Sequence, residues 1–128
     1  MTDGLEAAAR AAQAHAYAPY SHFRVGAALE GEDGRVFAGC NVENASYGLT
    51  ICAERAAVAT AVTQGTRRFR RIVIVSDIDP PAAPCGACRQ VLSEFGADLP
   101  VEGIGRSTRA SWTIGELLPA AFGPGSLA

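Results

Sequence analysis

Two cysteine-bearing segments constrain the fold of this chain more than any other feature. The first is Cys52-Ala53-Glu54-Arg55, and the second runs from Pro84 to Gln90 with the sequence PCGACRQ. Each begins a predicted helix, and Cys85 and Cys88, three residues apart, share one helical face. A helix N-terminus carries partial positive charge and free N–H groups, which stabilise thiolates. We therefore predict that the two N-termini converge and that Cys52, Cys85 and Cys88 hold one zinc ion per chain.

Three protein ligands leave one position of a tetrahedral zinc ion open for water, the mark of a catalytic zinc site. Glu54 follows Cys52 by two residues and is placed to exchange a proton with that water. Three thiolates on zinc carry one net negative charge, which a guanidinium from Arg55 donating to the sulfurs would offset. Cys-x-Glu followed by Pro-Cys-x-x-Cys matches the pattern of zinc deaminases, which act on an amine-bearing ring carbon.

Other interpretations of these residues stay open. Cys40 as a fourth ligand would close the site into a structural zinc cluster and make the chain an interaction module. A cysteine at a strand end with no second close cysteine is, however, more often a small buried hydrophobe. Glu54 and Arg55, taken alone, would be solvated side chains of a helix. His15 and His22 are not expected to be ligands, because His15 lies on a helix with no partner motif.

The charge balance favours a small ligand over a nucleic acid. The chain carries 11 basic and 13 acidic side chains, a formal net charge of -2, whereas nucleic-acid-binding proteins usually show a basic face. The basic run is interpreted as a solvated entry to a strand rather than a phosphate-binding patch; it comprises Arg67, Arg68, Arg70 and Arg71. This balance argues against a deaminase that edits polynucleotides.

Length and hydropathy set the expected organisation. The 128 residues fit one domain, 1–128. No stretch approaches the ~20 apolar residues of a membrane span, and the N-terminus lacks the apolar core of a signal peptide. We therefore expect no membrane partner and a cytoplasmic location, in which the four cysteines stay reduced and available to metal.

Periodicity and turn residues predict an α/β chain. The expected elements are a helix over 3–17, strands over 25–29 and 36–40 joined by a turn at 31–34, helices over 51–64 and 85–95, strands over 72–75 and 101–105, and a helix over 113–118. Gly65 stands at a helix C-cap, and Thr113 with Glu116 has the spacing of a capping box. Trp112 is expected to continue the sheet. This order predicts a mixed sheet covered by helices on both faces.

At these residues the chain resembles the small, homotetrameric class of cytidine deaminases, nearly from end to end. The matching blocks are Tyr17 to Phe23, Val25 to Leu29, Cys40 to Ala45, Cys52 to Arg55, Pro84 to Gln90, Glu116 to Pro119, and Phe122-Gly123. The conjunction is specific, whereas any one block alone would not be. The resemblance implies a three-layer α/β/α sandwich with a mixed sheet of about five strands. It also implies hydrolysis of cytidine and deoxycytidine to the uridines and ammonia, a step of pyrimidine salvage.

The family pattern assigns the zinc chemistry residue by residue. Cys52, Cys85 and Cys88 would bind the ion, Glu54 would shuttle protons, and Arg55 would tune the thiolates. A deaminase of the same fold acting on a modified cytosine nucleoside, such as an aminonucleoside antibiotic, remains the alternative within this class.

The pattern also assigns the nucleoside contacts. Asn41 and Glu43 would hold the ribose 3′-hydroxyl; they alternate along a strand end and so face one side. Phe23 would stack near the base, and the backbone of Ala53 would read the pyrimidine edge. Three further residues would line the pocket of a neighbouring subunit in the homotetramer: Ala45, Tyr47 and Phe122. Without the resemblance, Asn41 and Glu43 would be solvated loop residues and Phe23 a core residue.

One region departs from the family pattern. Between Val101 and Trp112 the expected hairpin looks shortened, and Gly103 and Gly105 replace residues that favour a strand. The length of the last strand is therefore left open, whereas the predicted chemistry is unaffected.

Overall fold

The fold is a five-stranded sheet with helices on both faces, and the computed structural model describes residues 3–127. The elements in chain order are α1 (Gly4–Gln13), β1 (Gly26–Gly31), β2 (Val36–Cys40), η1 (Tyr47–Leu49), α2 (Ala53–Thr63), β3 (Phe69–Val75), α3 (Gly86–Ser93), β4 (Pro100–Ile104), β5 (Arg109–Thr113), α4 (Ile114–Leu117) and η2 (Pro124–Leu127). The strand order is β2-β1-β3-β4-β5; β3 and β4 are parallel, and the other neighbours are antiparallel. This confirms the predicted three-layer α/β/α fold with a mixed sheet.

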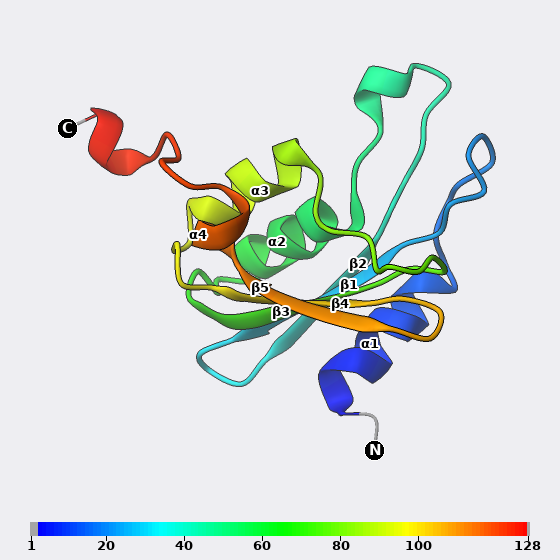
Figure 1. Cartoon of the computed structure of the whole chain (residues 1–128), viewed down its shortest axis with the longest axis horizontal. Helices are drawn as coiled ribbons and strands as arrows, with labels where there is room; N and C mark the ends of the chain where they lie inside the picture. The colour runs from blue at the N-terminus through cyan, green and yellow to red at the C-terminus, as the bar shows by residue number, and fades with distance from the viewer. Residues whose placement is uncertain (1–2, 128) are drawn as a thin grey trace.

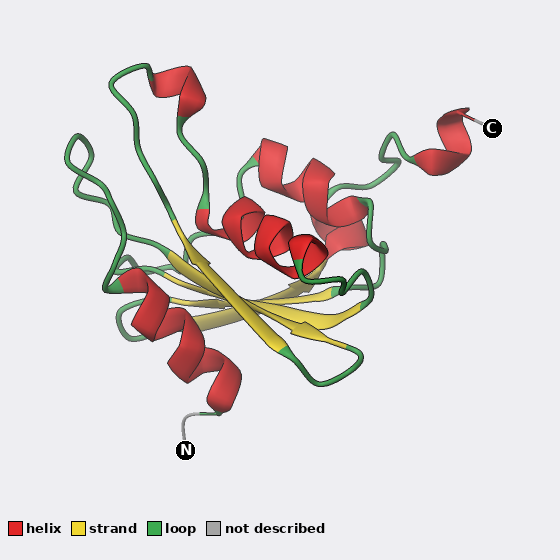
Figure 2. Ribbon diagram, turned by 180° about the vertical axis from the view of Figure 1, so that it is seen from behind, coloured by secondary structure: helices red, strands yellow, loops and turns green. Residues whose placement is uncertain are grey.

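Among the described helices, α1 covers one face of the sheet, whereas α2, α3 and α4 lie on the other face (Figures 1 and 2). Asp3 caps α1 by accepting a hydrogen bond of 2.8 Å from the backbone N–H of Glu6. The apolar stripe of α1 buries Leu5 and Ala9 against one side of the central strands. Because the two faces are covered separately, each has its own hydrophobic core.

Small residues bring α2 close to the sheet. Its buried face consists largely of alanines, including Ala53, Ala57 and Ala61. A Cβ atom on Gly39 of β2 would lie 2.6 Å from the backbone N of Ala57 and 2.7 Å from the carbonyl oxygen of Ala53. Glycine is therefore required at position 39 for this approach. The contact fixes the first turn of α2, which carries Glu54, against the end of β2.

The predicted helix over 3–17 is too long, because α1 ends at Gln13. After a turn the chain becomes extended: Tyr17 pairs with Val42, and its backbone N–H donates to the carbonyl oxygen of Asn41 at 3.0 Å. This long-range pairing outweighs the local helical pattern of Ala14 to Ala16. Val42 also pairs with Ile51, which is why α2 begins at Ala53 rather than at the predicted residue 51.

Other boundaries differ by a few residues. The strand predicted over 72–75 begins at Phe69, the helix predicted over 85–95 ends at Ser93, and η2 near the C-terminus was not predicted. β5 is five residues long and includes Trp112, and the capping box of Thr113 and Glu116 is present. Among the described residues, no helix combines the length and apolarity needed to cross a membrane.

Candidate functional site

The two cysteine segments meet where α2 and α3 begin. Cys52 is the residue before α2, Cys85 is the residue before α3, and Cys88 lies in the first turn of α3. The ligand atoms of the three residues all lie within 4.8 Å of one another, and the sulfurs of Cys52 and Cys85 are 3.7 Å apart. Zn–S bonds of about 2.3 Å in a tetrahedral site place two sulfurs about 3.8 Å apart. The cluster therefore fits one zinc ion, as the sequence predicted.

Cys40 does not belong to this cluster. It ends β2 and is partly exposed, and the cysteine group found among residues 3–127 comprises Cys52, Cys85 and Cys88. Three sulfur donors leave the fourth position of a tetrahedral ion open, which is the arrangement of catalytic rather than structural zinc. The arrangement does not favour the alternative of a closed structural cluster.

Arg55 reaches back from α2 to the sulfur side of the cluster. Its Nη2 atom donates to Sγ of Cys52 at 3.5 Å and to the carbonyl oxygen of Thr50 at 3.3 Å. Hydrogen bonds from the Cys88 thiol and from Arg55 lower the pKa of Cys52 to about 5, although burial opposes this shift. Arg55 is thus directed at the thiols rather than into solvent, and its charge offsets that of a thiolate.

Glu54 lies beside the same cluster in a position almost inaccessible to solvent. The residue is 5% exposed, and burial raises the pKa of its carboxyl group. Its place in the first turn of α2 directs it to the same pocket as Cys52 and Cys85. The interpretation of Glu54 as a solvated helix carboxylate is therefore wrong.

A cavity of about 230 Å³ opens over Glu54 and two of the three sulfurs. It joins the cluster to four predicted nucleoside contacts, Phe23, Asn41, Glu43 and Ala53. Sequence reasoning missed its remaining lining residues: Val25, Thr50, Ile74, Ala82 and Ala83. These residues carry no recognisable chemical motif, and only the tertiary fold brings their segments to the cluster.

Asn41 and Glu43 hold the segment that enters β1. The Asn41 side chain donates to the carbonyl oxygen of Phe23 at 2.7 Å and accepts from the backbone N–H of Val25 at 3.0 Å. Glu43 accepts from the backbone N–H of Tyr20 at 3.0 Å, and from the backbone N–H (3.1 Å) and hydroxyl of Ser21. The Ser21 hydrogen bonds hold the pKa of Glu43 below its usual value. An amide and a carboxylate have further lone pairs and N–H groups available for a ligand.

Ala45, Tyr47 and Phe122 lie away from this cavity. The segment between β2 and α2, which includes η1, projects from the body of the molecule, and so does the C-terminal end (Figure 1). Tyr47 is 74% exposed and Phe122 is 60% exposed. The structure therefore brings Phe23, Asn41, Glu43 and Ala53 to the cluster within one chain, but not these three residues.

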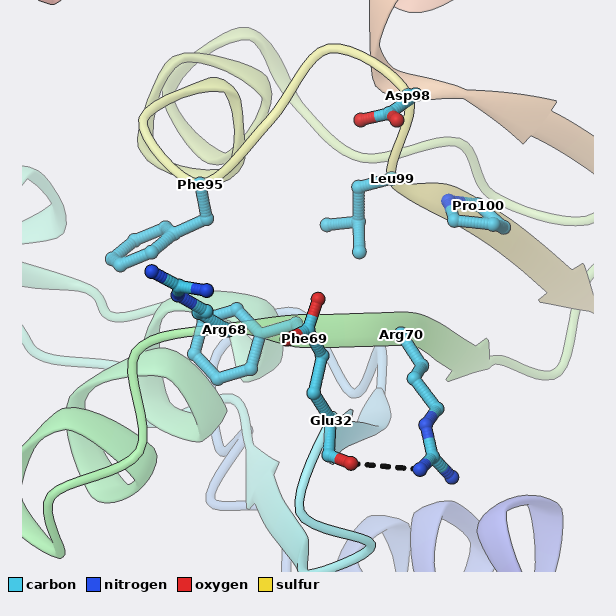
Figure 3. A pocket seen from close by; sticks show the side chains of 8 residues that line it. All are labelled: Glu32, Arg68, Phe69, Arg70, Phe95, Asp98, Leu99 and Pro100. Atoms are coloured by element: carbon cyan, nitrogen blue, oxygen red, sulfur yellow. Dashed lines mark hydrogen bonds between the residues drawn. The ribbon is translucent and has the colours of Figure 1, made fainter.

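A second hollow, of about 380 Å³, lies at the opposite end of β3 (Figure 3). Arg68 and Arg70 line it together with Glu32 and Asp98, so its charges offset one another. The Arg70 guanidinium already donates to the carbonyl oxygen of Glu32 at 2.7 Å. This mixed lining supports the interpretation of the basic run as a solvated strand entry.

Comparisons with known proteins agree with this geometry. The family model described as "Cytidine and deoxycytidylate deaminase zinc-binding region" matches residues 3–101, which include all three cysteines and Glu54. The chain belongs to the cytidine and deoxycytidylate deaminase family. Within this family, a cytidine deaminase of Sporosarcina psychrophila is 46% identical over 120 residues, covering 92% of this chain and 88% of the relative. A cytidine deaminase of Mycobacterium tuberculosis is 48% identical, covering 93% and 87%.

Solved structures of cytidine deaminases share the fold. The crystal structure from Burkholderia pseudomallei has a TM-score of 0.90 and 51% sequence identity, covering 95% of this chain and 100% of that one. The structure from Mycobacterium tuberculosis has a TM-score of 0.82 and 45% identity, covering 93% and 94%. The deaminase fold therefore extends beyond the zinc segments to almost the whole chain.

Proposed function

We propose that this chain hydrolyses cytidine and deoxycytidine to uridine and deoxyuridine, releasing ammonia. The observation that carries the proposal is the cavity in which a buried carboxyl group, Glu54, lies with Cys52 and Cys85 of the zinc-fitting cluster. Membership of a zinc-binding deaminase family agrees with this chemistry. The corresponding metabolic role is pyrimidine salvage, in a compartment reducing enough to keep four cysteines as thiols.

Bound zinc supplies a Lewis acid that activates water for attack on C4 of the cytosine ring. Glu54 accepts the proton that the attacking water loses and delivers it to ring N3. It then takes the proton of the hydroxyl group added at C4 and transfers it to the exocyclic nitrogen, which leaves C4 as ammonia while the hydroxyl oxygen becomes the ring carbonyl. Burial keeps Glu54 away from bulk water, so that it exchanges protons with the reacting atoms. Arg55, through its contact with Cys52, limits the negative charge of the thiolates.

The nucleoside is proposed to lie along the cavity with its base toward Glu54 and its sugar toward Asn41 and Glu43. Phe23 provides an apolar surface for the base, and the backbone at Ala53, the first residue of α2, provides polar groups for the pyrimidine edge. The amide of Asn41 and the carboxylate of Glu43 are suited to a sugar hydroxyl, which both donates and accepts. These features favour an unmodified ribose or deoxyribose over a modified sugar.

Ammonia release by the purified protein tests this proposal. We expect turnover of cytidine and deoxycytidine that a zinc chelator abolishes and added zinc restores. Parallel reactions contain a cytosine nucleoside with a modified sugar. No turnover of the two ordinary nucleosides, with turnover of the modified one, would replace the proposal by the alternative substrate class.

A homotetramer with shared sites is the assembly that we propose. In support, the projecting segment exposes Tyr47 and Leu49, and the C-terminal segment exposes Phe122 and Leu127. Exposed aromatic and aliphatic side chains on segments that leave the body are typical of surfaces covered by a second copy. In this arrangement Ala45, Tyr47 and Phe122 would complete a neighbour's cavity and exclude water from it.

Mixing two inactive variants tests the sharing of sites. Glu54→Gln removes the proton shuttle, and Phe122→Ala removes the aromatic group proposed to be donated to a neighbour. We expect each variant alone to be nearly inactive and mixed tetramers to regain part of the activity, because some sites combine an intact Glu54 with a donated Phe122. Native mass spectrometry establishes that subunits exchange. Hybrid tetramers without activity, or a fully active monomer, would contradict shared sites.

A further inference from the structure

The loop from Ser76 to Pro84 joins β3 to the zinc-binding end of α3 without regular secondary structure. Its second half supplies Ala82 and Ala83 to the wall of the catalytic cavity, and it leads directly into Cys85. A loop without a hydrogen-bonding ladder of its own takes its position from contacts with other segments. The contacts of this loop therefore bear on both the cavity wall and one zinc ligand.

Asp79 makes the densest polar contacts of this loop. Its carboxylate accepts hydrogen bonds from the backbone N–H groups of Ser107 and Thr108 at 3.1 Å, and from their hydroxyls at 2.7 and 2.8 Å. Both carboxylate oxygens are used. These hydrogen bonds, with those of Ser107 foremost, hold the pKa of Asp79 well below its usual range. Ser107 and Thr108 belong to the turn between β4 and β5, so the contact joins two loops 28 residues apart.

Backbone packing brings the same two loops together. A Cβ atom at Gly105 would collide with the carbonyl oxygen of Ile78 and with the carboxylate of Asp79. Gly103 is similarly restricted, since a Cβ there would lie 3.2 Å from Pro81 and 3.0 Å from the ring of Trp112. The two glycines that interrupt the expected strand pattern are thus the positions where the loop lies against the β4–β5 hairpin.

We infer that Asp79 is a positioning residue for the deaminase site, an inference that rests on the proposed function. Asp79 precedes Cys85 by six residues, and the hydrogen bonds with Ser107 and Thr108 hold the loop against the paired β4–β5 hairpin. Beyond it, Pro81 and Pro84 are buried, and the carbonyl oxygen of Pro84 accepts from Arg89 at 2.7 Å. Release of Asp79 frees the first half of the loop, so that the wall formed by Ala82 and Ala83 shifts. A small displacement of the cavity wall or of Cys85 weakens substrate positioning and metal retention.

The test compares Asp79→Asn and Asp79→Ala with the control Asp98→Asn, which changes an exposed carboxylate at the far end of the sheet. Three quantities are measured on zinc-loaded protein: the rate at which zinc passes to a chromophoric chelator, and KM and kcat for cytidine. We expect the Asp79 variants to release zinc about fivefold faster and to raise KM by a similar factor with a smaller change in kcat, a modest effect because the hydrogen bonds are exposed. Asp98→Asn is expected to match the wild type.

A second variant keeps the test decisive if the Asp79 variants fail to fold. Ser107→Ala combined with Thr108→Val removes the two hydroxyl donors and keeps the backbone, and it is expected to show the same effects in part. In the triple variant that also carries Asp79→Asn, the fold-changes in zinc release and KM should be smaller than the product of those of Asp79→Asn and of the double variant. The reason is that all three side chains act through one contact. Folded variants with wild-type zinc release and KM would overturn the inference. If the wild type did not deaminate cytidine, the proposed function would fail, whereas the zinc-release rates would still decide the role of Asp79.

Discussion

Glu54→Gln is expected to lower kcat for cytidine by about 10²–10⁴-fold, the usual contribution of a positioned general acid–base group. Glutamine has nearly the size of glutamate and keeps a hydrogen-bonding side chain in the buried position, but it cannot accept and return a proton. The measurement is steady-state ammonia release by protein whose zinc content has been determined. Zinc content and thermal unfolding are expected to stay close to those of the wild type, because Glu54 is not one of the three sulfur donors.

Glu94→Gln is a matched control for this substitution. Glu94 is an exposed carboxylate that follows α3, away from the cavity lining. Its replacement is expected to leave kcat unchanged. A loss of only a few-fold in Glu54→Gln, with full zinc content, would show that another group moves the protons and that the proposed mechanism is wrong.

Cys85→Ser is expected to abolish zinc retention and activity together, whereas Cys40→Ser is expected to keep both. The two remaining thiols bind zinc much more weakly than three do. Removing a residue that only supports a ligand lowers metal affinity by roughly 10–100-fold, and removing a direct ligand should lower it further. Cys40 lies outside the cluster, so a hydroxyl there leaves the donor set intact. Elemental analysis of both proteins after dialysis against zinc-free buffer gives the comparison. Loss of zinc from Cys40→Ser would support a closed structural cluster instead.

The zinc cluster could be predicted from sequence because its information is local. Cys52 and Glu54 lie in one short segment, Cys85 and Cys88 lie in another, and each segment is tied to a helix N-terminus. Only the convergence of the two segments depends on the tertiary fold. The capping box at Thr113 was predictable for the same reason.

Features set by long-range contacts could not be predicted in this way. The end of α1 at Gln13 follows from the pairing of Tyr17 with Val42, which local periodicity does not contain. Ala82 and Ala83 have no chemical signature, and they reach the cavity through the packing of their loop on the β4–β5 hairpin. Likewise, the glycines at 103 and 105 suggested a weakened strand, whereas β4 and β5 pair in full register and the glycines accommodate that loop.

Titration of zinc-free protein with zinc, with cytidine turnover followed at each addition, tests the central claim most directly. The claim is that one zinc ion per chain, held by Cys52, Cys85 and Cys88 beside Glu54, makes this protein a cytidine deaminase. Activity should rise linearly from a negligible value and reach its plateau at one equivalent of zinc per chain. Full turnover without zinc, or zinc bound at one equivalent without any turnover of cytidine or deoxycytidine, would contradict it.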